Sequence, residues 1–211
     1  MARKSRSACK LCEGSKHRWD EKRKAFVKCD CLKVKERSRL QDEAGIPTRY
    51  DGETWKTWAQ GFEVSDLKKI VLTARALKAG DSEAPWVLVH GNSEEGRMMS
   101  GALMARSACE GGLAARLFDI PRLIDEQFKD HAGAQFLYEL PVLIVEIGPE
   151  VGHKWNKVIM KKLVRDRWEA SLFTMLLVEG DPSRVAGSYG SPRIAEAIKK
   201  RFAKIRVRND K

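Results

Sequence analysis

Residues 86–101 read WVLVHGNSEEGRMMSG, and this stretch decides the expected fold. Residues 86–90 are mostly apolar and predict a short strand, and the residues from about 97 to 110 predict a helix. Gly91 and Gly96 lie between the two, and the four residues between them give the glycine spacing of a phosphate-binding loop. We interpret the stretch as a loop that descends from a nucleotide-binding loop. The alternative is a pair of glycines that only permits a tight turn.

The side chains of this loop depart from those of a working phosphate site. Arg97 and Met98 stand where the motif has Lys and Ser or Thr. The planar guanidinium of Arg97 keeps the charge but is not a compact ammonium, and Met98 has no hydroxyl to bind magnesium. Glu94 and Glu95 place two carboxylates in the loop, each of which would repel a phosphate oxygen about 4 Å away by ~1–4 kcal/mol. We therefore expect a remnant loop that has lost nucleotide turnover.

The chain around this loop alternates between apolar runs and helical patterns. The run LPVLIVEI at 140–147 is typical of a strand buried on both faces of a sheet. Such alternation predicts an α/β fold, with a parallel sheet flanked by helices and joined by right-handed crossovers. Strands are expected at residues 86–90, 113–118, 140–147, 171–178 and 205–207, and helices at 32–44, 65–79, 97–110, 120–129, 151–169 and 192–202.

The N-terminal fifth of the chain is basic and rich in cysteine. Residues 1–40 hold fourteen Lys or Arg against five Asp or Glu, which is +9 of the formal net charge of +11. Cys9, Cys12, Cys29 and Cys31 form two close pairs that sixteen residues separate. In a cytosolic chain this spacing predicts one structural zinc ion in a tetrahedral four-cysteine site. Reduced thiols without metal are the alternative, and His17 is a candidate replacement ligand or a solvent-facing histidine.

Basic and aromatic residues give further candidate contacts. Trp55 and Trp58 are three apart and stack on bases, anchor a partner, or pack the linker at 45–64 onto the core. Two basic clusters are candidates for binding nucleic-acid phosphates, with a solvated helix face as the alternative. The first is a helical stripe with spacings of three, four and four, and the second lies near the C-terminus: Lys154, Lys157, Lys161 and Arg165, then Lys199, Lys200 and Arg201.

No apolar run approaches the roughly 20 residues that span a bilayer, and the basic start MARKSRSACKLC lacks the apolar stretch of a signal peptide. We therefore expect a cytoplasmic protein without membrane contact.

Five segments follow one another in an order that points to a known family. They are RLQDEAGIPTRY at 39–50, VLVHG-x4-G at 87–96, ARLFDIPRLIDEQF at 115–128, LPVLIVEIG at 140–148 and SPRIAEAIKKRF at 191–202. This order resembles the bacterial replicative helicase loaders of the DnaC/DnaI type and the related IstB transposition proteins. The cysteine-rich start before GIP-x-R-Y resembles the DnaI branch. The resemblance implies an AAA+ P-loop ATPase core that loads a ring helicase onto single-stranded DNA. It divides the chain into a basic zinc-binding module at 1–44, a linker with the GIPTRY segment at 45–64 and an AAA+-like P-loop core at 65–211.

The family's other catalytic positions also differ in this sequence. Val145 stands where the resemblance implies an Asp that holds magnesium, and Glu146 stands at the acid that orients water. Glu179 lies in a VEGD stretch that replaces a Thr-Ser-Asn phosphate sensor. Arg193 is kept, but Ala197 replaces the arginine that would reach a neighbouring subunit. Glu146 is thus a weak candidate for a catalytic base, and the alternative is a carboxylate that pairs with a neighbouring Arg or a helix N-terminus.

These differences predict a helicase-loader-like replication accessory protein, in a bacterium or a phage, that is a pseudo-ATPase and acts as an assembly factor. The expected partners are a replicative ring helicase or another replication protein, and single-stranded DNA; self-association stays open. One structural zinc ion is expected, and neither ATP nor magnesium is. Two alternatives remain: a divergent but active DnaC/IstB-type ATPase, and a zinc-containing nucleic-acid-binding protein on a dead ATPase scaffold.

Overall fold

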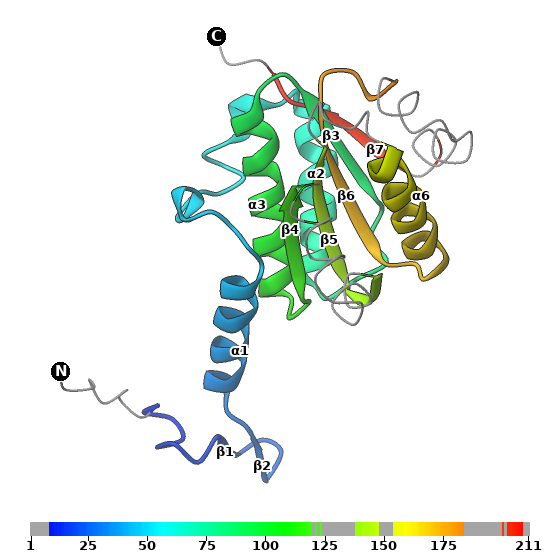
Figure 1. Ribbon diagram of the computed structural model, residues 1–211. Helices are drawn as coiled ribbons and strands as arrows, with labels where there is room; N and C mark the ends of the chain where they lie inside the picture. The colour runs from blue at the N-terminus through cyan, green and yellow to red at the C-terminus, as the bar shows by residue number, and fades with distance from the viewer. Residues whose placement is uncertain are drawn as a thin grey trace, which may run out of the picture.

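The computed structural model describes residues 9–119, 121, 123, 138–147, 154–183, 200 and 202–208, and the fold is given for these. A parallel sheet has the strand order β4-β5-β6-β3-β7, and a separate antiparallel hairpin, β1-β2, precedes it (Figure 1). The strands are β1 (His17–Asp20), β2 (Ala25–Lys28), β3 (Val87–Gly91), β4 (Ala115–Asp119), β5 (Val142–Ile147), β6 (Phe173–Glu179) and β7 (Ala203–Arg206). The α-helices are α1 (Asp30–Glu43), α2 (Val64–Lys78), α3 (Glu94–Glu110) and α6 (Lys154–Glu169).

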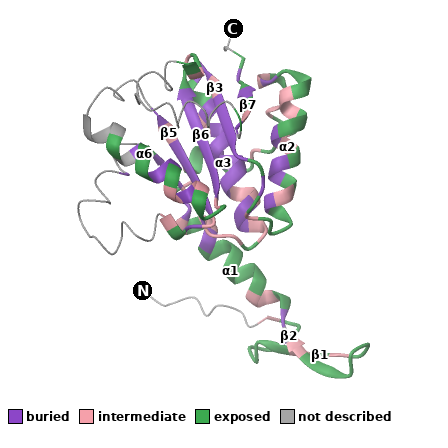
Figure 2. Cartoon of the chain, turned by 90° about the vertical axis from the view of Figure 1, so that its right-hand side faces the viewer, coloured by how far each residue is buried: buried purple, intermediate pink, exposed green. Residues whose placement is uncertain are grey.

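The central strands β3, β5 and β6 are buried on both faces, because nearly all of their residues are apolar. Successive side chains of a strand point to opposite faces. Val87 and Val89 accordingly join the core cluster on the side of α2 and α3, whereas Leu88 joins the cluster on the side of α6. Figure 2 shows the central strands as a buried layer between helices. The predicted parallel sheet flanked by helices is therefore confirmed.

The expected element bounds agree with the structure to within a few residues, with two exceptions. The hairpin β1-β2 was not expected from the sequence. Helix α3 begins at Glu94 rather than near Arg97, because the side chain of Ser93 caps it: Ser93 Oγ accepts a hydrogen bond from the Gly96 N–H at 3.1 Å. The helices expected at 120–129 and 192–202 fall almost entirely outside the described residues.

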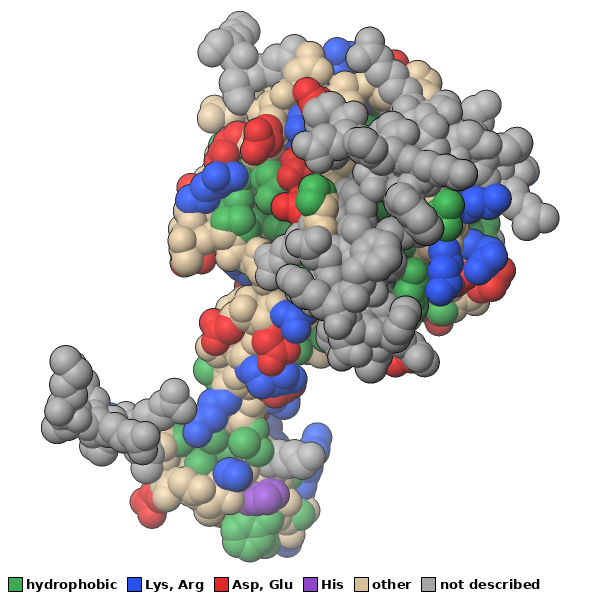
Figure 3. All heavy atoms as spheres, viewed as in Figure 1, with side chains coloured by type: hydrophobic (Ala, Val, Ile, Leu, Met, Phe, Trp, Pro, Cys, Tyr) green, Lys and Arg blue, Asp and Glu red, His purple; other side chains and the backbone are tan. Residues whose placement is uncertain are grey.

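The N-terminal module, which consists of residues 9–29 with the hairpin β1-β2, lies away from the sheet at the N-terminal end of α1 (Figures 1 and 3). Helix α1 is exposed along most of its length, and its C-terminal end alone enters the core, through Leu40 and the following Ala44. The carbonyl of Ala44 accepts a hydrogen bond from the Leu117 N–H of β4 at 2.9 Å. The hairpin is therefore carried at a distance from the parallel sheet.

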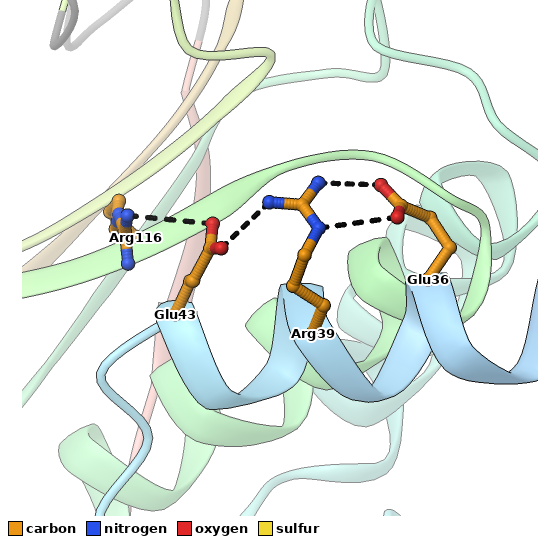
Figure 4. Close-up of polar contacts among 4 residues, drawn as sticks. All are labelled: Glu36, Arg39, Glu43 and Arg116. Atoms are coloured by element: carbon orange, nitrogen blue, oxygen red, sulfur yellow. Dashed lines mark hydrogen bonds and ion pairs between the residues drawn. The ribbon is translucent and has the colours of Figure 1, made fainter.

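A chain of charges follows α1 to the same contact (Figure 4). Arg39 binds Glu36 at 2.5 Å and Glu43 at 2.6 Å, and Glu43 in turn lies 3.7 Å from Arg116 of β4. These ion pairs are solvent-exposed, so each contributes little free energy by itself. Together they align the last turns of α1 with the edge strand.

Residues 46–58 pack against α3. Tyr50 is fully buried against Met99, Ala102 and Leu103 of that helix. Arg106 of α3 donates hydrogen bonds to the carbonyls of Tyr50, at 2.8 Å, and Glu53, at 2.7 Å. Trp55 and Trp58 are half-buried against the same cluster, which agrees with packing onto the core.

No described helix combines the length and the apolar character that a membrane span requires.

Candidate functional site

The four N-terminal cysteines converge on one point. Cys9 and Cys12 lie in the turns before β1, Cys29 precedes α1 and Cys31 lies in its first turn. All four sulfur atoms lie within 4.8 Å of one another; Cys9 Sγ is 3.8 Å from Cys29 Sγ, and Cys12 Sγ is 3.6 Å from Cys31 Sγ. Zinc–sulfur bonds of about 2.3 Å in a tetrahedron place neighbouring sulfurs about 3.8 Å apart. The cluster therefore has the geometry of a metal site, and its four thiols fit zinc.

Backbone hydrogen bonds hold the ligand loop in place. The carbonyl of Cys9 accepts hydrogen bonds from the N–H groups of Cys12 and Glu13, and the Cys29 N–H donates to the carbonyl of Lys16 at 2.9 Å. His17 is exposed and lies outside the cluster of metal-binding atoms, so the cluster consists of the four cysteines.

The thiols of this cluster differ in acidity. Burial disfavours the Cys12 thiolate, but hydrogen bonds from the backbone at Gly14 and Lys16 and from the neighbouring thiols outweigh it and lower the pKa of Cys12 to about 7. Burial and the neighbouring thiols raise the pKa of Cys31 to about 12. Metal binding deprotonates all four sulfurs, so it displaces protons from this cluster.

The glycines of the remnant loop are required by a packing contact. A Cβ atom at Gly91, where φ is +148°, would lie 2.7 Å from the carbonyl oxygen of Val207. A Cβ atom at Gly96 would lie 2.3 Å from the Cγ1 of the same valine. Val207 follows β7, and its N–H donates to the carbonyl of His90 at 2.8 Å. The residue after β7 thus approaches both glycines so closely that a Cβ atom at either one would collide with it.

Arg97 folds inward instead of reaching toward a ligand. Its side chain is 5% exposed, and its Nη1 donates a hydrogen bond to the carbonyl of Gly91 at 2.7 Å. Its Nη2 lies 3.7 Å from Glu146 Oε1, at the carboxyl end of β5. The N–H of Gly180 also donates to the Gly91 carbonyl, at 3.1 Å. The guanidinium of Arg97 is therefore bound to groups at the carboxyl ends of β3 and β5.

Glu94 and Glu95 correct one expectation from the sequence. They lie in the first turn of α3 rather than in a loop, and both are exposed. Glu95 accepts a hydrogen bond from the hydroxyl of the otherwise buried Tyr50 at 3.3 Å and lies 3.9 Å from Arg49. Carboxylates are favourable at a helix N-terminus for the same reason that phosphates are, namely the partial positive charge of the free N–H groups.

Glu146 is half-buried beside Arg97, and its pKa is raised by burial although the guanidinium opposes that shift. Val145 is fully buried and points into the core on the side of α6, so this position has no group for magnesium. Within the described ranges, the four cysteines are the one cluster of three or more potential metal ligands.

The predicted basic clusters are only partly described. Lys154, Lys157, Lys161 and Arg165 all lie in α6, where Lys161 and Arg165 are exposed and Arg165 pairs with Asp166 at 2.7 Å. The side chains of Lys154 and Lys157 lie outside the described residues. In the second cluster Lys200 is exposed, and Lys199 and Arg201 lie outside the described residues.

Arg167 belongs to the core, although its neighbours in the sequence are basic surface residues. It is fully buried and donates hydrogen bonds to the carbonyls of Leu140, at 2.8 Å, and Phe173, at 2.6 Å, and to Thr174 Oγ1, at 2.9 Å. Burial lowers its pKa to about 9. Its place four residues after the buried Leu163 is the sequence signal that puts it on the apolar face of α6.

Comparison with solved structures identifies the fold. The chain is similar to the DnaC helicase loader, with a TM-score of 0.61 and 14% identity over 77% of this chain and 100% of that one. It is similar to DnaI, with a TM-score of 0.62 and 14% identity over 82% and 98%. It is also similar to a proposed primosome component from Streptococcus pyogenes serotype M3, with a TM-score of 0.58 and 13% identity over 82% and 96%. No family model and no curated protein matches the sequence. The chain therefore has the fold of DnaC-type helicase loaders.

Proposed function

We propose that this protein is a DNA-replication accessory protein that works as an assembly factor, binding a replicative ring helicase and single-stranded DNA without hydrolysing ATP. The proposal is supported by a fold shared with the DnaC helicase loader and with DnaI. It is supported equally by the inward position of Arg97, which is the observation that carries the loss of catalysis.

A working phosphate loop points backbone N–H groups and a cation at the phosphate. In this chain the Gly96 N–H is bonded to Ser93 Oγ, and the Arg97 N–H is bonded to the Ser93 carbonyl at 3.2 Å. The guanidinium of Arg97 is bonded to the Gly91 carbonyl. A triphosphate would have to break a buried, charge-assisted hydrogen bond of about 1.5–3 kcal/mol and leave Glu146 without its cation. The N–H groups of Gly96 and Arg97 and the Nη1 of Arg97 are thus bonded within the protein, whereas the buried Arg97 Nε has no partner.

The test measures ATP turnover and partner capture on the same zinc-loaded preparation. We expect no magnesium-dependent phosphate release, and we expect capture of a bacterial replicative ring helicase to be the same with and without ATP. Magnesium-dependent turnover that Arg97→Ala abolishes would overturn the proposal in favour of the divergent ATPase.

A second candidate function is a zinc-containing nucleic-acid-binding protein that uses the ATPase fold only as a scaffold. The basic charge of residues 1–40 favours it. Salt-dependent binding of single-stranded DNA together with no capture of any ring helicase would select this function over the first.

A further inference from the structure

We propose that one face of the β1-β2 hairpin is a stacking platform for single-stranded nucleic acid, with Trp19 and Phe26 in contact with bases and the basic hairpin turn in contact with phosphates. This inference rests on the proposed function and deepens it, because it assigns the single-stranded DNA to a defined surface of the zinc module.

The two aromatic residues are cross-strand partners on the exposed face of the hairpin. Their ring centroids lie 5.3 Å apart with an interplanar angle of 71°, so the edge of one ring meets the face of the other. Trp19 is 47% exposed and Phe26 is 73% exposed. The strand alternation places His17, also exposed, on the same face. An edge-to-face pair covers at most one face of one ring, so ring faces remain open to a base.

The opposite face of the hairpin holds the module together. Arg18 points to this side and lies 3.4 Å from Asp30 at the start of α1. Cys29 follows β2 directly, so the metal cluster anchors the strand that carries Phe26. A metal bound at the base of so short a hairpin can fix its two strands without a hydrophobic core. The two aromatic side chains can then stay exposed.

The turn between the strands supplies the charge. Residues 21–24 read EKRK, and Lys22, Arg23 and Lys24 are exposed. Two acids lie close by: Asp20 Oδ1 accepts hydrogen bonds from the N–H groups of Lys22, at 3.0 Å, and Arg23, at 3.1 Å, and Glu21 of the turn is exposed. The turn therefore keeps three basic side chains against one exposed carboxylate. In the part of the chain that the structure describes, none of these three basic side chains has an ion-pair partner.

This combination selects a polynucleotide as the occupant. Protein interfaces are enriched in aromatic residues but depleted in lysine. Single-stranded nucleic acids are bound where aromatic side chains and basic side chains alternate along one surface, because bases stack while phosphates pair. Figure 3 shows hydrophobic side chains and a histidine at the tip of the module, with Lys and Arg side chains close by. The tip lies at the far end of α1 from the parallel sheet, so a strand bound there leaves the sheet domain open to a protein partner (Figure 1).

The test is binding of a fluorescein-labelled 20-mer of deoxythymidine to the full-length, zinc-loaded protein, followed by fluorescence anisotropy. We expect Trp19→Ala and Phe26→Ala each to weaken binding by about 5- to 100-fold, since each removes one stacked base. Trp19→Phe keeps a stacking ring and should recover most of the affinity. Leu72→Ala removes an exposed apolar side chain of α2 and is the matched control, with unchanged affinity expected.

Salt dependence separates stacking from charge. We expect the aromatic variants to keep the wild-type slope of log affinity against log salt concentration. Lys22→Ala with Arg23→Ala should reduce the magnitude of that slope by about 0.7 for each phosphate that the protein no longer neutralises. Zinc content, measured on each variant, shows that the module is still folded.

Unchanged DNA affinity in a zinc-loaded Trp19→Ala/Phe26→Ala variant overturns the inference. If that variant instead loses capture of a ring helicase, the face belongs to a protein partner, and the proposed function stands without this inference. If the wild-type protein captures no helicase but DNA binding depends on Trp19 and Phe26, the proposed function fails and the inference stands.

Discussion

Arg97 stands at the position where the phosphate-binding-loop motif has a lysine, yet its hydrogen bonds are made to the protein. Its partners, the Gly91 carbonyl and Glu146, are the ends of two strands of the sheet. The residue therefore has a structural role, and its charge stabilises the carboxyl edge of β3 and β5.

Removing this charge should destabilise the fold. We expect Arg97→Met, which keeps much of the side-chain volume, to lower the free energy of unfolding by about 1.5–3 kcal/mol, because Gly91 loses a charge-assisted hydrogen bond and Glu146 loses its cation. Urea unfolding measures the change. Adding Glu146→Gln to Arg97→Met should recover part of the loss, and a double variant that is as unstable as the sum of both single variants would contradict the pairing.

The half-buried Glu146 predicts a pH dependence of stability with a definite sign. Burial raises its pKa, so the native state holds this proton more tightly than the unfolded chain does. The resulting stability is complete below the ordinary pKa of 4.5 and is lost as pH rises through the raised value. Glu146→Gln removes the titration, so we expect its free energy of unfolding to rise relative to the wild type as the pH is raised above the ordinary pKa of 4.5. A relative fall over this range, measured by urea unfolding, would show that the pKa is lowered instead.

At the scale of elements, the turn from β3 to α3 consists of Asn92 and Ser93 alone, because α3 starts at Glu94. The turn and the first helical residues pack against Val207 after β7. The two glycines of the remnant loop thus belong to one contact between the two ends of the sheet domain.

This contact predicts opposite behaviour for the two glycines. Gly96→Ala should cost about 1–3 kcal/mol, because the new Cβ meets Val207 Cγ1. In a Val207→Ala background that carbon is absent, and Gly96→Ala should become neutral or gain up to about 1 kcal/mol from helix propensity. Gly91→Ala should not be rescued, because its Cβ meets the backbone carbonyl of residue 207 at a φ of +148°. Thermal unfolding of the six proteins of these two cycles is the measurement, and equal costs for Gly96→Ala in both backgrounds would rule out the contact.

The same elements show which parts of the fold the sequence could reveal. The strands were predictable because continuous apolar runs such as residues 142–145 are buried on both faces. The start of α3 was predicted three residues too late, because Gly96 has the spacing of a loop glycine while Ser93 caps the helix before it. The contact with Val207 joins distant parts of the chain, and no local pattern contains it. The hairpin was missed because its four-residue strands are too short for a reliable period of two.

One of the two candidate sites could be predicted from the sequence, and the arrangement of the other could not. The cysteine spacing was sufficient to predict the metal cluster, because ligands in two close pairs constrain the geometry by themselves. The inward turn of Arg97 could not be predicted, because it depends on the carbonyl of Gly91 at the end of β3 and on a carboxylate of a strand far along the chain.

At the scale of the whole molecule, two parts are held together by different forces. The sheet domain is held by two hydrophobic clusters on either side of the sheet. The N-terminal module has exposed apolar side chains and converging thiols in place of such a core. Small modules of this kind are usually folded by their metal.

Removing the metal should therefore unfold one part and spare the other. We expect one zinc ion per chain by elemental analysis. A strong chelator should remove it and abolish hydrogen-exchange protection in residues 9–31, while β3, β5 and β6 stay protected. Cys12→Ser should have the same effect without a chelator, and Cys109→Ser, a buried cysteine of α3, is the control that keeps the zinc. Loss of protection throughout the sheet on chelation, or an absorbance spectrum of an iron–sulfur cluster, would contradict the assignment.

Helix α1 also sets the orientation of the hairpin relative to the parallel sheet. Its fourteen residues span about 21 Å, and each residue turns the helix by about 100°. One residue inserted into α1 would rotate the aromatic face of the hairpin about the helix axis by more than a quarter turn and move it only about 1.5 Å along that axis. Seven inserted residues would restore the original orientation to within about 20° and move the hairpin about 10 Å further from the sheet. The length of α1 therefore sets the angle, about the helix axis, between a ligand bound at the hairpin and a partner bound at the sheet domain.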